Sequence, residues 1–213
     1  MTHSVDLNSD MGEAFGPWTM GDDSALLDIV TSANIACGFH AGDPDVMAKT
    51  MAAAKAGGVG IGAHPGFADM RGFGRYQMQV PHKTLANDVR YQVGAAQAMA
   101  KAAGGELRHL KLHGALSNMA MKDAELARVA FLAALEVAPG IIVMGLAGTV
   151  MGGVARDLGC AWAGEIFADR AYEPDGTLVD RRKPGSNRHR TSPASISTSG
   201  SSSAATRPPF LGI

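Results

Sequence analysis

The sequence predicts an α/β fold built on a parallel sheet that curls into a barrel. Short apolar runs of β-favouring residues alternate with longer segments of helical pattern, which is the order typical of βαβ units. Polar side chains follow these runs where the strands should end, as in parallel α/β barrels. We expect strands over residues 5–8, 32–36, 59–63, 107–112, 141–146 and 160–167.

Helices are expected between these strands. The first begins after Asp43, whose carboxylate can cap it, and ends at Gly57, a common helix stop. The next two helices are expected over residues 83–103 and 123–137, each ending before a glycine-containing turn. A shorter helix is expected over residues 149–157.

Composition describes one domain with a hydrophobic core, since 46% of the 213 residues are hydrophobic and 18% are charged. A net charge of −1 gives no reason to expect nucleic acid or a membrane surface as partner, so a small-molecule substrate fits better. The first residues lack the apolar run of a signal peptide, and no stretch is long enough to span a membrane, so we expect a cytoplasmic protein. Cys37 and Cys160 are expected to be thiols, and a nucleophilic Cys37 is the less common alternative to a buried structural one.

Ionisable side chains follow five of the predicted strands. They are Asp10 and Glu13, then His40 and Asp43, then His64, then His113, and after the last strand Glu165, Asp169 and Arg170. Each has a structural alternative when taken alone, because Asp43 can cap a helix and a single histidine can be a paired core residue. Burying several such groups together is costly unless chemistry or a ligand requires it, so their convergence favours a functional site.

The loops add a second signal. Glycines stand beside histidines at 37–43 and 60–66, which we interpret as letting the backbone approach a small ligand and donate to it. Neither loop has phosphate-loop spacing, so we expect any use of ATP to depend on another polypeptide. The stretch RGFGR at 71–75 is interpreted as an arginine clamp for an anion or as a solvated loop. Lys111 and His113 share a strand face, and His113 is the leading candidate for proton transfer.

Several of these segments together resemble the LamB/YcsF family. They are VDLNSDMGE at 5–13 and the segments 32–43, 62–66, 72–75, 91–95, 111–118 and 165–172. The resemblance runs in order over about residues 3 to 185. It implies a seven-stranded barrel related to the polysaccharide deacetylase fold. It also implies an ATP-dependent 5-oxoprolinase that opens 5-oxoproline to L-glutamate, with partner subunits B and C and with ATP and Mg bound through the complex.

Site residues follow from the resemblance by position. It implies catalytic roles for Asp10, His113, Glu165 and Lys111, and substrate binding by Glu13, His40, Asp43, His64, Arg75, Asn118 and Asp169. We assign activation of the attacking water to Asp10 or Glu165 and proton transfer to His113. Lys111 or Arg75 would stabilise the negative charge that develops during the reaction. No resident metal is expected. The chain departs from the family pattern at Tyr76, Leu112, Ser117 and Asp180, and Ser117 removes an aromatic surface from the barrel mouth.

Two other functions remain open from the sequence. The first is a metal-dependent deacetylase-like hydrolase with Asp10, His40 and His64 as ligands, because a carboxylate and two histidines suit a catalytic zinc or similar ion. The second is an inactive truncated scaffold subunit that only binds its partners.

The end of the chain differs from the rest. Residues 1–185 are expected to form the barrel domain, and the Ser/Arg-rich residues 186–213, which contain no acidic residue, a disordered tail. The resemblance stops after about Gly185, where the family has its final helix and seventh strand, so we expect the barrel to lack both. A frame shift in the coding sequence would explain this, and a natural binding tail is the alternative. An unclosed barrel exposes strand edges, which predicts lower stability than that of full-length relatives, aggregation, and weak or no activity even with subunits B and C.

Overall fold

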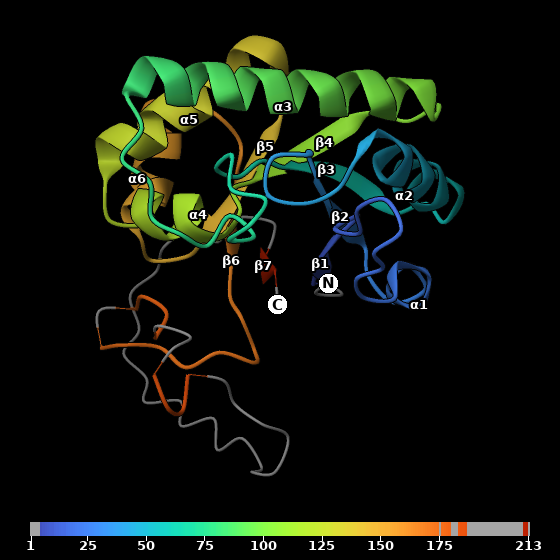
Figure 1. The fold of residues 1–213 in the computed structure, drawn as a ribbon. Helices are drawn as coiled ribbons and strands as arrows, with labels where there is room; N and C mark the ends of the chain where they lie inside the picture. Colours follow the sequence, from blue (N-terminus) through green and yellow to red (C-terminus); the bar gives the residue numbers. More distant parts are fainter. Residues whose placement is uncertain (1–4, 175, 180–182, 187–210, 213) are drawn as a thin grey trace, which may run out of the picture.

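The computed structural model describes residues 5–174, 176–179, 183–186 and 211–212. Its main strands are β1 (Asn8–Met11), β2 (Ser32–Ala36), β3 (Gly60–His64), β4 (Leu107–Lys111), β5 (Ile142–Leu146) and β6 (Trp162–Glu165). Each pairs in parallel with the next along the chain. These six strands form a curled half-barrel, so the predicted parallel α/β architecture is confirmed (Figure 1).

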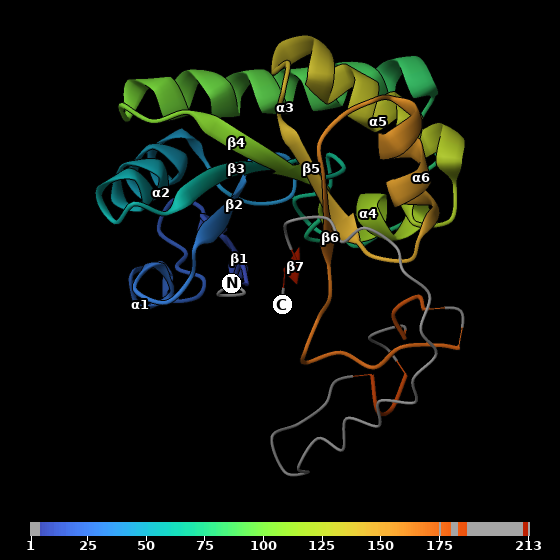
Figure 2. The ribbon, with the colours of Figure 1, turned by 180° about the vertical axis from the view of Figure 1, so that it is seen from behind.

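A two-residue strand, β7 (Leu211–Gly212), continues the sheet beyond β6. It pairs in parallel with Gly164 and Glu165 and lies between β6 and β1 in both views (Figures 1 and 2). Among the described residues no pairing joins β7 to β1. The other expectations for the tail, including its disorder and its origin in a frame shift, fall on residues 187–210 and lie outside the described part of the chain.

The helices connect successive strands. They are α1 (Asp23–Leu27), α2 (Pro44–Ala56), α3 (His82–Ala102), α4 (Gly114–Ala120), α5 (Ala124–Val137) and α6 (Val150–Asp157). The helix α2 packs against β2 and β3, α3 packs against β3 and β4, and α5 lies alongside α3. None of the helices in the described part of the chain is long and apolar enough to span a membrane.

The four predicted helices are confirmed to within one residue at each end. Asp43 caps α2 as expected, since its Oδ1 accepts hydrogen bonds from the backbone N–H groups of Asp45 and Val46, each at 2.9 Å. The helices α1 and α4 were not predicted. Both span fewer than eight residues, which is too short for an apolar repeat to show in the sequence.

Alternation along the strands separates two faces of the sheet. Ile35, Ile61 and Leu110 belong to the apolar core that the helices cover. The neighbouring positions on the same strands carry polar side chains, such as Asn34 and His109, which meet across the concave face. The half-barrel therefore has an apolar outer layer and a polar interior.

The predicted position of the first strand is wrong. It was expected over residues 5–8 as a short β-favouring run, but the strand runs over Asn8–Met11, whose Asn8 and Asp10 are poor strand formers. The inward-facing polar groups find partners inside the half-barrel: the Asn8 Oδ1 accepts hydrogen bonds from Asn34 Nδ2 at 2.7 Å and Lys111 Nζ at 3.1 Å. Asp10 consequently lies within a strand and not after it. The other five strands begin and end within two residues of their predicted bounds.

Candidate functional site

Polar side chains of β1, β2, β4 and β6 form a connected group that we call the interior network. Its members are Asn8, Asp10, Asn34, His109, Lys111 and Glu165. Lys111 is at its centre, and its Nζ donates to Glu165 Oε1 at 2.6 Å, Asn8 Oδ1 at 3.1 Å and Asp10 Oδ1 at 3.2 Å. All three ammonium protons can therefore be satisfied in a buried position.

The charges of this network stabilise one another. Burial alone would lower the pKa of Lys111, but the carboxylates of Asp10 and Glu165 raise it. Burial alone would likewise raise the pKa of Asp10, but His64 and Lys111 hold it well below its usual value. Lys111 is thus a cation and Asp10 an anion at neutral pH. The two carboxylates differ in access, since 38% of the Asp10 side chain is exposed and 4% of the Glu165 side chain.

His109 occupies the amino-terminal part of the network. Asn34 donates through Nδ2 to Asn8 and Asp10, so its Oδ1 accepts from His109 Nε2 at 2.7 Å. Burial and the nearby charge of Lys111 lower the pKa of His109 to about 3, which keeps the ring neutral. The ring lies directly over Gly62, where a Cβ atom would overlap it.

A second group lies at the carboxyl ends of the strands, and we call it the mouth cluster. It consists of Glu13, His40, His64 and His113. His64 is the last residue of β3, His113 precedes α4, and Glu13 and His40 lie on the loops that follow β1 and β2. One side-chain nitrogen or oxygen of each residue lies within 4.8 Å of those of the other three. The convergence predicted from the sequence is therefore confirmed for these four residues.

Two backbone carbonyls orient the rings of His64 and His113. His64 Nδ1 is 2.8 Å from the Lys111 oxygen, and His113 Nε2 is 2.8 Å from the Phe73 oxygen. A carbonyl can only accept, so both of these nitrogens carry protons. The opposite nitrogens, His64 Nε2 and His113 Nδ1, then face each other at 3.0 Å. Asp10 Oδ2 lies 3.4 Å from the same His64 nitrogen.

His40 is fully buried and stacks on His113, with ring centroids 3.6 Å apart and planes 3° from parallel. Its Nε2 lies 3.5 Å from Glu13 Oε1, which is longer than an ordinary hydrogen bond, and the two atoms form none. Both ring nitrogens and Glu13 Oε1 lack a hydrogen-bond partner among the described residues. Burial and the charge of His64 lower the pKa of His40 to about 3, while burial raises that of Glu13.

Two glycines near the histidines make room for the imidazole rings. A Cβ atom on Gly66 would lie 2.9 Å from His40 Nδ1, and one on Gly74 would lie 2.7 Å from His40 Cβ. The expected donation of loop N–H groups to a ligand stays a prediction for the other glycines of the loops. The Gly66 N–H instead donates to the buried Gln92 Oε1 at 3.0 Å. Phe73 adopts a left-handed φ of 55° and supplies the carbonyl for His113, a strained conformation of the kind found at functional sites.

The remaining predicted site residues lie outside both groups. The exposed guanidinium of Arg75 is 4.8 Å from the centre of the Phe73 ring, beside the mouth cluster. Within the described part of the chain, Asp43 accepts hydrogen bonds from backbone N–H groups alone, those of α2 and that of Gly16 at 2.7 Å, as in the capping alternative. Asn118 is exposed on α4, and Asp169 is exposed after β6. Their roles in substrate binding stay predictions.

Sequence reasoning missed Asn8, Asn34, His109, Gln92 and Phe73. Two of them carried a usable signal. Asn34 is a polar residue in the middle of a buried strand, and His109 stands two residues before Lys111 and so shares its face. The positions of Gln92 and Phe73 depend on contacts between distant segments.

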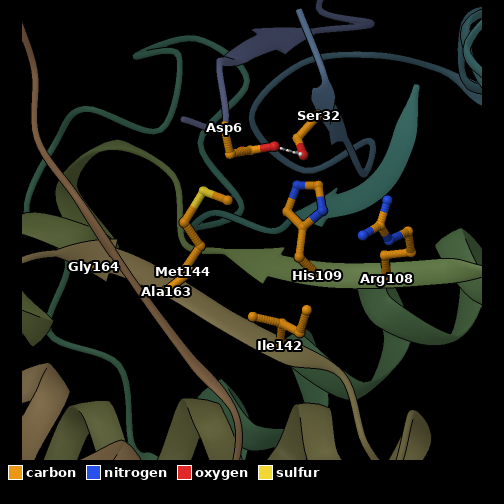
Figure 3. Close-up of a pocket in the computed structure, with 8 residues that line it drawn as sticks. All are labelled: Asp6, Ser32, Arg108, His109, Ile142, Met144, Ala163 and Gly164. Carbon is orange, nitrogen blue, oxygen red and sulfur yellow. Dashed lines mark hydrogen bonds between the residues drawn. The ribbon is translucent and has the colours of Figure 1, made fainter. Parts of the chain in front are cut away.

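The amino ends of the strands enclose a small cavity of about 30 Å³ (Figure 3). Its lining comprises Asp6, Ser32, Arg108, His109, Ile142, Met144, Ala163 and Gly164. Figure 3 shows Asp6 bonded to Ser32 above the His109 ring. A cavity of this size holds a water molecule or two, so it is too small for a substrate.

Together these features define a parallel α/β half-barrel with ionisable groups gathered at the carboxyl ends of its strands, the active-site face of such folds. A model of the LamB/YcsF family matches residues 5–198. The chain belongs to this family. The match extends past Gly185, where the motifs alone had indicated its end.

Individual relatives carry a consistent description. The chain is 66% identical over 185 residues to the 5-oxoprolinase A subunit of Ruegeria pomeroyi, an alignment covering 87% of this chain and 73% of that protein. It is 54% identical over 188 residues to the 5-oxoprolinase A subunit of Rhodopseudomonas palustris strain BisB5, with the same shares. Among solved structures, the lactam utilization protein of Thermus thermophilus superimposes with a TM-score of 0.82 at 45% identity, covering 86% of this chain and 74% of that one.

Proposed function

We propose that this chain is the A subunit of an ATP-dependent 5-oxoprolinase, which with subunits B and C cleaves 5-oxoproline to L-glutamate coupled to ATP hydrolysis. The relatives named as 5-oxoprolinase A subunits support this assignment. The observation that carries the proposal is the position of Lys111. Its ammonium group is paired with the carboxylates of Asp10 and Glu165, directly beside the histidines of the mouth cluster. The site thus offers a fixed cation, an ionised carboxylate and imidazoles on one face.

The reaction needs these groups. A five-membered lactam is a resonance-stabilised amide, so its hydrolysis at neutral pH requires an activated carbonyl, a positioned water and a proton for the leaving nitrogen. Phosphoryl transfer from ATP with Mg to the amide oxygen would supply the activation and release ADP. Water then adds to the activated carbon, the ring C–N bond breaks, and phosphate leaves with glutamate. We assign ATP binding to the complex, because the sequence shows no phosphate loop.

The geometry refines the residue roles. Asp10 is ionised and more accessible than Glu165, so we assign it to positioning the water and Glu165 to holding Lys111. Lys111 would stabilise negative charge that develops on the substrate. Burial, followed by the charge of His64, lowers the pKa of His113 to about 2. Burial alone would lower the pKa of His64 too, but Asp10 raises it. In the metal-free chain His64 therefore holds the transferable proton, and His113 shares it across their 3.0 Å contact.

We also propose that the barrel of full-length relatives has seven strands and is related to the polysaccharide deacetylase fold, and that this chain lacks the last helix and strand of that barrel. The two-residue strand β7 pairs with β6 at the edge where such a strand would lie. The free thiols of Cys37 and Cys160 are consistent with a cytoplasmic complex.

Reconstitution tests the proposed function. The purified chain is mixed with subunits B and C, and 5-oxoproline-dependent release of ADP and glutamate is measured. We expect both products in equal amounts from the full mixture, and neither when any one of the three polypeptides is omitted. Turnover by the isolated chain, or full turnover by B and C without it, would contradict the proposal.

A further inference from the structure

Two lone pairs face each other inside the mouth cluster. The carbonyls of Lys111 and Phe73 fix protons on His64 Nδ1 and His113 Nε2, so in the neutral rings the facing nitrogens are both acceptors. Their separation is 3.0 Å. Two acceptors at this distance repel each other unless a proton or a metal ion lies between them.

A proton would satisfy only this pair. Glu13 Oε1 and both nitrogens of His40 would remain without partners among the described residues, and leaving buried polar groups unpaired is costly. His40 is 0% exposed, so solvent does not readily replace the missing partners. A single ion bound by all four residues would satisfy the facing lone pairs, one His40 nitrogen and the Glu13 oxygen together.

We propose that Glu13, His40, His64 and His113 bind a divalent transition-metal ion, with Zn²⁺ the best-suited common ion. Three imidazoles and one carboxylate form a donor set that zinc and its first-row neighbours prefer. This inference rests on the geometry of the chain and does not depend on the proposed reaction.

The spacing of the donors suits such an ion. Donors about 2.0–2.1 Å from a tetrahedral zinc lie about 3.3 Å from one another. The facing histidine nitrogens are 3.0 Å apart, His40 Nε2 is 3.5 Å from Glu13 Oε1, and His113 Nδ1 is 3.8 Å from the same oxygen. Small side-chain shifts would bring all four donors into range.

The second hydrogen bonds of the rings have the form found around metal-bound histidines. A ligating imidazole commonly donates its other N–H to a backbone carbonyl or carboxylate, which fixes its tautomer and orientation. His64 and His113 both do so, each at 2.8 Å. The glycines at 66 and 74 allow the rings to pack closely enough to converge.

The ligand set differs from the sequence-based alternative of Asp10, His40 and His64. Asp10 Oδ1 is bound by Asn34 and Lys111 in the interior network, and its Oδ2 lies 3.4 Å from His64 Nε2, outside the group of four convergent donors. Glu13 and His113 take its place. An ion at this site would replace the proton shared by His64 and His113, so ion binding and proton sharing are alternative uses of the same two nitrogens.

Metal titration of the purified full chain tests the proposal. After chelator treatment the chain is titrated with Zn²⁺ or Co²⁺, the bound metal is measured by mass spectrometry, and the Co²⁺ spectrum is recorded. We expect one equivalent and a tetrahedral or five-coordinate Co²⁺ spectrum. His40→Gln and His113→Gln should each weaken binding by more than the ~10–100-fold that follows loss of an outer-shell partner.

His109→Gln is the matched control, because His109 is equally buried yet paired with Asn34, and it should leave metal affinity unchanged. If circular dichroism shows that the histidine variants misfold, thermal unfolding of the Glu13→Gln variant and of the wild-type chain tests the site instead. The wild type should unfold at a higher temperature with Zn²⁺ and the variant should lose most of that shift. Absence of stoichiometric binding to the folded wild type, or equal binding by the variants and control, would overturn the site.

Discussion

The interior network and the mouth cluster are both made of buried polar side chains, but they differ in how their hydrogen-bonding atoms are used. In the interior network Lys111, Asn34 and His109 each bond to another member. In the mouth cluster His40 and Glu13 keep buried atoms without partners among the described residues. Lys111, Asn34 and His109 are therefore paired without a ligand, whereas His40 and Glu13 would be paired by one.

Neither burial nor a lowered histidine pKa distinguishes the mouth cluster from the interior network. His40 and His109 are both buried, and burial lowers the pKa of each to about 3. What differs is the partner, since His109 has the amide of Asn34 and His40 has none among the residues that the structure describes. The interior network leaves one buried nitrogen, Asn8 Nδ2, without a partner among the described residues, whereas in the mouth cluster both nitrogens of His40 and the nearby Glu13 Oε1 lack one.

Removing Lys111 should have the largest effect on the interior network. Lys111→Met leaves the carboxylates of Asp10 and Glu165 without their cation in a buried site, which typically costs about 3–5 kcal/mol of stability. Urea unfolding measures the loss. The control is Lys183→Met, whose pair with Glu173 is exposed and should change stability by less than about 1 kcal/mol. Similar effects of the two substitutions would show that the network is not stabilised by its central charge.

Crowding of the mouth cluster can be tested at a glycine. Gly74→Ala combines a φ of 63° with an added Cβ only 2.7 Å from that of His40. Gly104 has a similar φ of 73°, but nothing lies within 4 Å of its added Cβ. We expect Gly104→Ala to cost about 1–2 kcal/mol from the backbone alone. Gly74→Ala should cost about 1–3 kcal/mol more because of overpacking. Equal losses in thermal or urea unfolding would mean that the rings are not tightly packed.

Catalysis in the assembled complex should depend on the mouth cluster and not on surface histidines. His113→Ala should lower kcat by about 100-fold or more with the fold retained, as for loss of a proton-transfer group or a metal ligand. His82→Ala is the control, since His82 lies on the surface and is paired with Glu125, at 3.2 Å. Steady-state release of glutamate measures both. Near-normal turnover by His113→Ala would remove this residue from the mechanism.

The smallest expected effect is a change in the pH dependence of stability at His109. Burial, then Lys111 and Arg108, lowers its folded-state pKa to about 3, so between about pH 3 and 6.5 the unfolded chain binds the extra proton. The contribution of neutral His109 to the free energy of unfolding is fully present above the unfolded-state pKa and decreases as the pH falls toward the folded-state pKa. Relative to neutral pH, the decrease reaches about 2 kcal/mol at pH 5.

His109→Gln should remove that dependence. Urea unfolding at pH 5 and pH 7.5 compares the two proteins, and the wild type should lose about 2 kcal/mol more than the variant. If the wild type and the variant lose the same stability between pH 7.5 and pH 5, His109 is not buried as a neutral ring.

Local signals were sufficient for much of the fold. Asp43 with Pro44 predicted the start of α2, and apolar runs separated by glycine turns predicted five strands to within two residues. They failed at β1, because Asn8 and Asp10 are poor strand formers and are stabilised there by Asn34 and Lys111 from other strands. The short helix α4 was missed for a related reason, since its seven residues carry too little periodicity to be seen.

For the site, the sequence by itself determined the residue types and their places at strand ends, because strand periodicity and the parallel order bring carboxyl ends to one face. That was enough to bring Asp10, His64, Lys111 and His113 together. Only the tertiary structure decided their partners. Which nitrogen of His64 and of His113 is protonated depends on the carbonyls of Lys111 and Phe73, and the approach of Glu13 to His40 at 3.5 Å depends on how the loops after β1 and β2 fold. Hydrogen bonds and ligand sites require positions correct to a few tenths of an ångström between residues far apart in the chain, and packing alone sets those distances.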